Sequence, residues 1–243
     1  MLITVAATIF LLVVWEAAAR IIGYDIILPT FTSVCVAFAE MFVTGTFWIS
    51  VAGTLLRSVT GFAVAFVLGV VLGITAGKYR ALDSVLLPFN SIMRTIPVAA
   101  ITLVLGVWLA PDVIPSIIGM MLIFPVVYEQ SKTAVKVLPE ELEEIMDEAG
   151  ASFPYRFVNL YLPSVMPHIL SNISATFGMN LKAVITAETL MLALNSIGLQ
   201  IHYAYSNFLF ETPALFAWVL TAVLMSVGIE AILKFAVKKS LRV

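Results

Sequence analysis

Apolar segments long enough to cross a lipid bilayer recur along this chain, and they limit what it can fold into. A helix needs about 20 mostly apolar residues to span the hydrocarbon core. Six segments reach or approach that length: Leu2–Ile22, 51–76, 82–109, 113–128, 165–194 and 213–237. A chain that is 61% hydrophobic and 12% charged has too little polar surface to stay dissolved. The sequence therefore predicts an all-α fold, a polytopic membrane protein of about six transmembrane helices forming one domain over residues 1–243.

The N-terminal region has two interpretations. Residues 17–19 are alanines and resemble a signal-peptide cleavage site, but no basic residue precedes the apolar run and Glu16 occupies the cleavage region. We favour a retained helix in which Glu16 and Arg20, four residues apart, form an ion pair. The cleaved signal peptide remains the alternative, and whether residues precede Met1 is open. Apolar residues at helical spacing over 34–42 then predict a short amphipathic helix at the membrane interface.

Small residues follow one face of the second segment at every fourth position: Gly61, Ala65, Gly69, Gly73 and Gly77. Such a row forms a groove in which another helix backbone can approach closely. We therefore expect Gly61, Gly69, Gly73 and Gly77 to pack against a second helix, within a bundle or a dimer. The alternative is that glycine is simply frequent in membrane helices.

Basic residues are concentrated in three groups that predict the orientation in the membrane. Nine of the thirteen follow the second segment, lie between the fourth and fifth, or close the chain: Lys78, Arg80, Lys132, Lys136, Arg156, Lys234, Lys238, Lys239 and Arg242. Because basic loops stay in the cytoplasm, we expect both termini and the loop 137–163 on the cytoplasmic side of a bacterial inner membrane. No basic stripe typical of nucleic-acid binding is present. The single cysteine, Cys35, excludes an intrachain disulfide.

The loop 137–163 holds six of the fifteen acidic residues: Glu140, Glu141, Glu143, Glu144, Asp147 and Glu148. Pro139 suits the start of a helix, the acids complement its positive end, and Gly150 suits its termination. Its apolar residues would share one face: Leu142, Ile145, Met146 and Ala149. A solvated acidic helix is the alternative, but leaving such side chains in water forgoes about 1.5–3 kcal/mol each. We therefore expect this face to enter a groove on a partner protein.

The loop resembles the permease signature of ATP-binding cassette (ABC) importers, in which a Glu-Ala-Ala start is followed by a glycine and then by Ile-x-Leu-Pro. Glu144 and Gly150 stand at that spacing, followed by Leu160, Leu162 and Pro163, while Ile145 and Met146 replace the two alanines. Further stretches make the chain similar to the nitrate, sulfonate, taurine and bicarbonate type of permease: 28–34, 54–57, 61–62, 94–97, 187–188 and 197–199.

This resemblance implies a type I importer permease (MetI-like) fold and a transport function. The helix 140–152 would dock into a cytoplasmic ATPase, of which each importer has two copies. The coupling residues would be Leu142, Glu144, Ile145, Met146, Ala149 and Gly150. ATP and magnesium would be bound by the ATPase and no cofactor by this chain. An extracytoplasmic binding protein would deliver the solute, and a second copy of the permease would complete a homodimer.

Polar residues in the fifth segment predict the solute pathway: Asn180, Lys182, Thr186 and Glu188. A charge at bilayer depth costs several kcal/mol unless it faces a cavity or a partner. Lys182 therefore suits a small polar, anionic solute. The alternative is a structural ion pair of Lys182 with Glu188 or Glu129. Arg94, beside a proline kink, is expected to bind free backbone carbonyls instead.

Other functional classes have less support in the sequence. A phosphate-binding loop needs Gly, four residues, then Gly-Lys-Ser/Thr, and the nearest match, which starts at Gly73, is one residue short. His168 and His202 are far apart in sequence and belong to no His and Cys cluster that suggests a metal site. A secondary transporter, the alternative function, should have matched halves, and a membrane enzyme should have a nucleophile with a base; neither pattern is visible.

Overall fold

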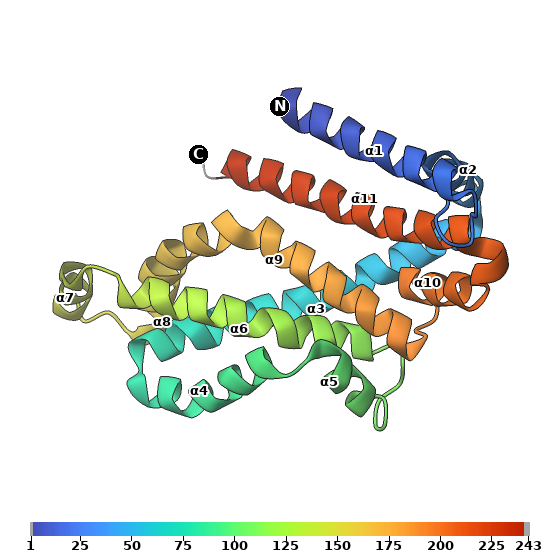
Figure 1. Ribbon diagram of the computed structural model, residues 1–243. Helices are drawn as coiled ribbons and strands as arrows, with labels where there is room; N and C mark the ends of the chain where they lie inside the picture. The colour runs from blue at the N-terminus through green and yellow to red at the C-terminus, as the bar shows by residue number, and fades with distance from the viewer. Residues whose placement is uncertain (1, 241–243) are drawn as a thin grey trace.

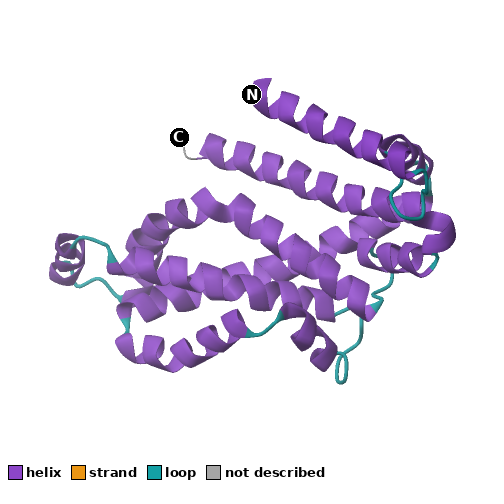
Figure 2. Cartoon of the chain, viewed as in Figure 1, coloured by secondary structure: helices purple, strands orange, loops and turns teal. Residues whose placement is uncertain are grey.

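The computed structural model describes the backbone of residues 2–240 and their side chains, except those of 2–5, 208, 210, 239 and 240. Every regular element in this range is helical (Figures 1 and 2). In chain order they are α1 (Leu2–Ile22), α2 (Phe31–Phe42), α3 (Gly45–Lys78), α4 (Arg80–Thr95), α5 (Val98–Leu105), α6 (Ile114–Lys136), α7 (Glu140–Glu148), α8 (Phe153–Arg156), the π-helix η1 (Phe157–Tyr161), α9 (Leu162–Met191), α10 (Ile197–Ser206) and α11 (Phe208–Ser240). The predicted all-α class is confirmed.

Within the described residues, three helices are long and apolar enough to cross a membrane: α3, α6 and the 211–238 part of α11. The pair α4 and α5 passes the same test together, but the two helices are bent by 101°. The expected third span is therefore two helices, because Pro97 forces Ile96 out of the helical region, to φ −69° and ψ 126°. α9 has 30 residues but is interrupted by polar side chains.

α4 has its polar face inside and its apolar face outside. Asn90 is buried, and its side chain donates a hydrogen bond to Glu129 Oε1 of α6 at 2.7 Å. Val85, Phe89 and Ile92 are each more than half exposed. In water this arrangement would be costly, whereas in a membrane those apolar side chains face lipid. The reversed polarity therefore agrees with a membrane protein.

The core lies where α3 packs along α6 and α9 (Figure 1). The four glycines Gly61, Gly69, Gly73 and Gly77 all face α6. A Cβ at Gly61 would lie 2.4 Å from the carbonyl oxygen of Ser116, and one at Gly73 would lie 2.6 Å from that of Tyr128. Real Cβ atoms essentially never come this close, so the backbones of α3 and α6 approach each other in a way that only glycine permits.

α1, α2 and α11 form a second group beside this core (Figure 1). Glu16 pairs with Arg20 at 2.7 Å, as predicted, and also accepts hydrogen bonds from the backbone and hydroxyl of Thr32. The α2 helix begins at the cap Thr30, whose side chain accepts from the backbone N–H of Ser33. Trp218 of α11 stacks on Phe47 with ring centroids 5.6 Å apart. These contacts join α1 to α2, and α11 to the start of α3.

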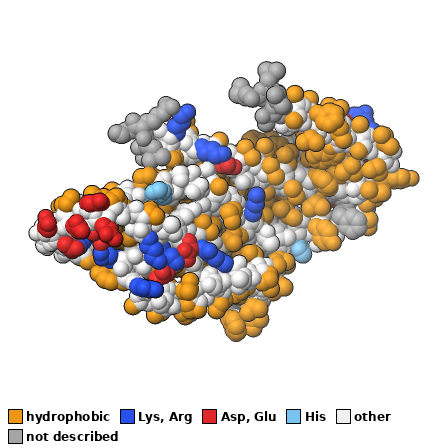
Figure 3. All heavy atoms as spheres, turned by 60° about the vertical axis from the view of Figure 1, so that its left-hand side comes forward, with side chains coloured by type: hydrophobic (Ala, Val, Ile, Leu, Met, Phe, Trp, Pro, Cys, Tyr) orange, Lys and Arg blue, Asp and Glu red, His pale blue; other side chains and the backbone are white. Residues whose placement is uncertain are grey.

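The long axis of the molecule has two different ends (Figure 1). α7 projects alone at one end, while α10 and the turn that follows α9 lie at the other. In the space-filling view, acidic side chains cluster on one tip, Lys and Arg side chains gather behind it, and apolar side chains cover much of the remaining surface (Figure 3). On the face shown in Figure 3, exposed charged side chains are therefore concentrated at the α7 end.

Candidate functional site

α7 begins after Pro139, and its end is set by Gly150. Gly150 has a φ of +62°, and a Cβ there would meet nothing within 4 Å, so the left-handed backbone and not crowding favours glycine. The backbone N–H of Gly150 donates to Asp147 at 2.9 Å and that of Ala151 donates to Met146 at 3.0 Å. These bonds satisfy terminal carbonyls of the helix. The helix therefore spans 140–148, shorter than the expected 140–152.

Two side-chain anchors hold α7 on the membrane helices. Glu143 forms an ion pair with Lys78 at the end of α3 and accepts a hydrogen bond from the Tyr161 hydroxyl at 3.1 Å. Burial and the adjacent Glu143 carboxylate raise the pKa of the Tyr161 hydroxyl above its ordinary value. Arg156 pairs with Asp147 at 2.5 Å and donates to the carbonyl of Ala151 at 2.8 Å. α7 is thus attached to α3 on one side and to α8 and η1 on the other.

The apolar face of α7 is divided between the protein and the solvent. Leu142 and Ile145 are 39% and 59% exposed. Met146 is half-buried and packs against the core between α3, α6 and α9. Glu144 and Ala149 are exposed, and Glu144 has no ion pair or hydrogen bond within the described part of the chain. Of the predicted coupling residues, five are therefore exposed and available to a partner: Leu142, Glu144, Ile145, Ala149 and Gly150.

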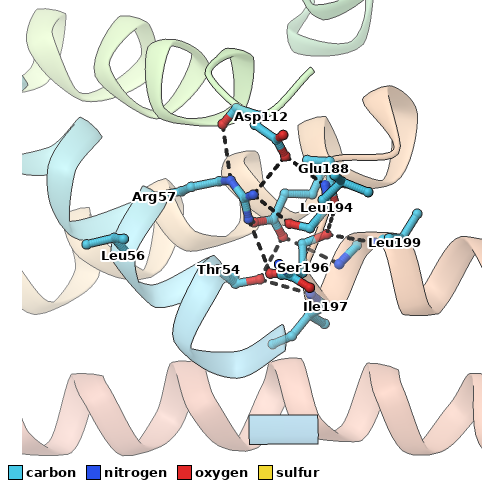
Figure 4. A network of polar contacts seen from close by, with 12 residues as sticks. Thr54, Leu56, Arg57, Asp112, Glu188, Leu194, Ser196, Ile197 and Leu199 are labelled. Atoms are coloured by element: carbon cyan, nitrogen blue, oxygen red, sulfur yellow. Dashed lines mark hydrogen bonds and ion pairs between the residues drawn. The ribbon is translucent and has the colours of Figure 1, made fainter. Parts of the chain in front are cut away.

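A network of polar contacts lies at the opposite end of the molecule (Figure 4). Arg57 of α3 donates to Asp112 Oδ1 at 3.0 Å, to Glu188 Oε1 at 3.3 Å and to the carbonyl of Leu194 at 2.6 Å. Asp112 in turn accepts the backbone N–H of Leu194 at 2.7 Å. The guanidinium therefore joins α3, the start of α6 and the turn after α9.

Thr54 and Glu188 complete this network below the guanidinium. The Thr54 hydroxyl donates to Glu188 Oε2 at 2.8 Å and accepts the backbone N–H of Ile197 at 2.9 Å. Gly198 leaves the room this needs, since a Cβ there would lie 2.4 Å from the Cβ of Glu188. The matching stretches 54–57, 187–188 and 197–199, distant in sequence, therefore meet in space. Sequence reasoning gave Arg57 no role, because its partners lie 55 or more residues away.

The four residues predicted to line the solute pathway occupy two different faces of α9. Asn180 and Glu188 are fully buried, and Asn180 donates to the carbonyl of Ser58 in α3 at 2.8 Å. Lys182 and Thr186 are exposed and border a groove of about 480 Å³ between α9 and α11. Two of the four are thus packing residues in this structure. The alternative ion pairs of Lys182 with Glu188 or Glu129 are absent, since these carboxylates bind Arg57 and Lys132.

The exposed face of α9 continues toward the α7 end with polar residues that sequence reasoning did not assign to a pathway. His168, Ser171 and Asn172 border a cavity of about 380 Å³ between α9 and α6, together with Gln130 and Thr133. Counted from His168, Ser171, Asn172, Ala175 and Lys182 follow at three, four, seven and fourteen residues, which puts them on one helical face. The sequence signal that could have identified this face is the helical spacing of the polar residues that begins at His168.

Arg94 and possible metal ligands are the remaining side chains that the sequence singled out. Arg94 donates to the carbonyl of Pro125 at 3.0 Å, so its guanidinium binds a carbonyl at a proline, as expected, although the proline belongs to the neighbouring α6. Among the described side chains, no group of three or more His, Cys, Asp or Glu residues could hold a metal ion.

Residues 65–239 match the sequence profile of the family described as binding-protein-dependent transport system inner membrane component. The chain is 27% identical over 166 residues to the bicarbonate transport system permease protein CmpB of Synechococcus elongatus, covering 67% of this chain and 59% of that protein. It is 28% identical over 162 residues to the nitrate import permease protein NrtB of Synechocystis, covering 65% and 58%.

The fold resembles a solved structure of the MetNI methionine ABC transporter in an inward-facing conformation. The TM-score is 0.62 at 17% identity, and the match covers 83% of this chain and 96% of the other. At that identity the likeness shows the fold, which is the predicted MetI-like one. The family profile covers most of the chain and reaches from the glycine row of α3 past α7 to α11. The chain therefore belongs to the binding-protein-dependent transport system inner membrane components, the membrane-embedded permeases of ABC importers.

Proposed function

We propose that this permease is driven by a separate ATPase that docks on α7, and that it imports a small polar, anionic solute delivered by an external binding protein. Two ATPase copies and a second copy of this permease complete the importer, and ATP and magnesium are bound by the ATPases. The observation that carries the proposal is an exposed apolar pair, Leu142 and Ile145, on a helix that projects from the bundle and is anchored at both sides.

The anchors make α7 suitable for force transfer. An exposed helix with free ends would follow a moving ATPase without displacing the membrane helices. Here Lys78 is the last residue of α3 and Tyr161 directly precedes α9, and both bind Glu143. A push on α7 therefore reaches two membrane-embedded helices through the Glu143 carboxylate.

The docking is tested by Ile145→Asp, with Ile145→Leu as the matched control. Ile145 is mostly exposed, so neither substitution removes a core contact. We expect Ile145→Asp to reduce co-purification of the ATPase and ATP-dependent uptake together, since a charge would enter an apolar groove, and Ile145→Leu to preserve both. Intact association and uptake in the Asp variant would refute the docking assignment.

The anionic solute is supported by Lys182. This cation is exposed on α9, and no described carboxylate forms an ion pair with it, since Glu230 in the same groove pairs with Lys234. A charge at bilayer depth requires water or an oppositely charged group. Two relatives are named as bicarbonate and nitrate permeases, and both of these solutes are small anions. In proteoliposomes, Lys182→Gln should slow nitrate or bicarbonate uptake, and Lys238→Gln, which alters an exposed lysine away from this groove, should not.

The cytoplasmic placement of both termini and of α7 rests on the basic residues. Lys78, Arg80, Lys132, Lys136 and Arg156 all belong to elements at the α7 end. α11 runs from α10 toward that same end (Figure 1); Arg242 lies outside the described residues. Labelling of single cysteines introduced at Glu148 and Ser206, in a Cys35→Ser background, should show that only Ser206 reacts with an impermeant thiol reagent added to intact cells.

A further inference from the structure

A cavity of about 520 Å³ lies where α3 ends, α4 begins and α6 passes beside them. Three cationic side chains line it, Lys78, Arg80 and Lys136, together with the carboxylate of Asp83. α3 is long and apolar enough to cross a membrane, and α4 passes the same test together with α5, so we expect the junction of α3 and α4 at Tyr79 to lie at a membrane surface. We propose that this cavity binds the anionic headgroup of a membrane phospholipid. The site is separate from the transport function proposed above.

The charges around the cavity are not balanced. The Asp83 carboxylate already binds Lys132 at 3.0 Å, Lys136 at 2.9 Å and the Tyr128 hydroxyl at 3.0 Å. Lys78 is held by Glu143. Arg80 is exposed, and its side chain forms no hydrogen bond or ion pair with the described part of the chain. One guanidinium, suited to binding a phosphate through two parallel hydrogen bonds, therefore remains available.

The apolar surface beside the cavity favours a lipid over a soluble phosphate. Leu87 borders the cavity and is 52% exposed, and Val85 and Phe89 on the same helix are 61% and 59% exposed. This outward face of α4 runs from the cavity toward the middle of the membrane. A phospholipid could place its headgroup among the cations and an acyl chain along α4. A free phosphate would contact only the cations.

The membrane supplies such ligands on the side where the basic residues are expected. The cytoplasmic leaflet carries anionic lipids, and basic pockets between transmembrane helices on that side are suited to their headgroups. Lys78 links this cavity directly to Glu143 of α7. A bound headgroup would therefore stabilise the junction that positions α7.

The test is native mass spectrometry of the detergent-solubilised complex of permease and ATPase, titrated with phosphatidylglycerol or with phosphatidylcholine of the same acyl chains. We expect the wild type to bind phosphatidylglycerol more tightly. Arg80→Gln should weaken that binding about fivefold, the effect of one basic side chain near an anionic surface, and Arg80→Lys should restore part of it. Because Arg80 is exposed, the substitution leaves the packed core intact.

Lys234→Gln is the matched control, because Lys234 is an exposed lysine, 65% accessible, on another helix that runs to the same end. An equal loss in Arg80→Gln and Lys234→Gln would mean general charge attraction and would overturn the site. Equal binding of the two lipids would overturn its preference for an anion. Displacement of phosphatidylglycerol by millimolar inorganic phosphate would assign the cavity to a soluble anion and overturn the lipid.

Discussion

Gly73→Ala is the sharpest test of the packing between α3 and α6. The new Cβ would lie 2.6 Å from both the Ser131 Cβ and the Tyr128 carbonyl oxygen. The carbonyl belongs to the backbone of a packed helix, so relief requires the two helices to move apart. Such overpacking costs about 1–3 kcal/mol, and the higher helix propensity of alanine returns at most about 1 kcal/mol.

Gly228→Ala in α11 is the matched control, because a Cβ there would meet nothing within 4 Å. It should be neutral or stabilise the protein by about 0.5–1 kcal/mol. The assay is the unfolding midpoint of the purified permease in one detergent. We expect Gly73→Ala to unfold at a lower midpoint than the wild type and Gly228→Ala at an equal or higher one. Equal midpoints for the two variants would refute the close approach of α3 and α6.

Three further predictions concern the ends of the molecule. Glu188→Ala should destabilise the permease by about 1–3 kcal/mol in the same assay, because the buried Thr54 hydroxyl loses its acceptor while Arg57 keeps its pair with Asp112; no measurable loss would contradict the network. Gly150→Ala should cost about 1–2 kcal/mol through its left-handed backbone, and Gly150→Asn less, as unfolding midpoints will show. Glu143→Gln should change the free energy of unfolding by less than about 1 kcal/mol, since the pair of Glu143 with Lys78 is partly exposed. It should nevertheless lower the amount of solute transported per ATP hydrolysed. An unchanged ratio of transport to hydrolysis would count against this anchor.

The helical class, the glycine row and the end of α7 follow from local patterns that a sequence reveals. The glycines recur at the helical period, and Gly150 closes an amphipathic stretch, so each signal lies within a few residues of its consequence. The bent shape of the third span, in contrast, does not follow from a local pattern. Prolines 88 and 97 are both visible in the sequence, yet Pro88 lies inside α4 while Pro97 accompanies a bend of 101°. Which proline bends the chain depends on the neighbours that bind the freed carbonyls.

The polar residues of α9 could be found from the sequence, but the sequence did not reveal which of them are buried and which are exposed. Glu188 and Lys182 both interrupt an apolar segment, and their costs at bilayer depth look alike. Their environments differ because α3 brings Thr54 and Arg57 to one face of α9, while Lys182 faces a groove in which the described carboxylate, Glu230, is paired with Lys234. The decisive contacts join residues more than 130 positions apart, beyond the reach of any helical spacing.

The two ends of the molecule are connected by the same pair of helices. α3 contributes Arg57 to one end and Lys78 to the other, 21 residues apart, or about 32 Å along a helix. α9 contributes Glu188 to one end and begins beside Tyr161 at the other. Between them, the glycines leave α3 no free space along α6. Since close-packed helices transmit displacement instead of absorbing it, we expect a shift of α7 on the proposed ATPase to displace the Arg57 network as well.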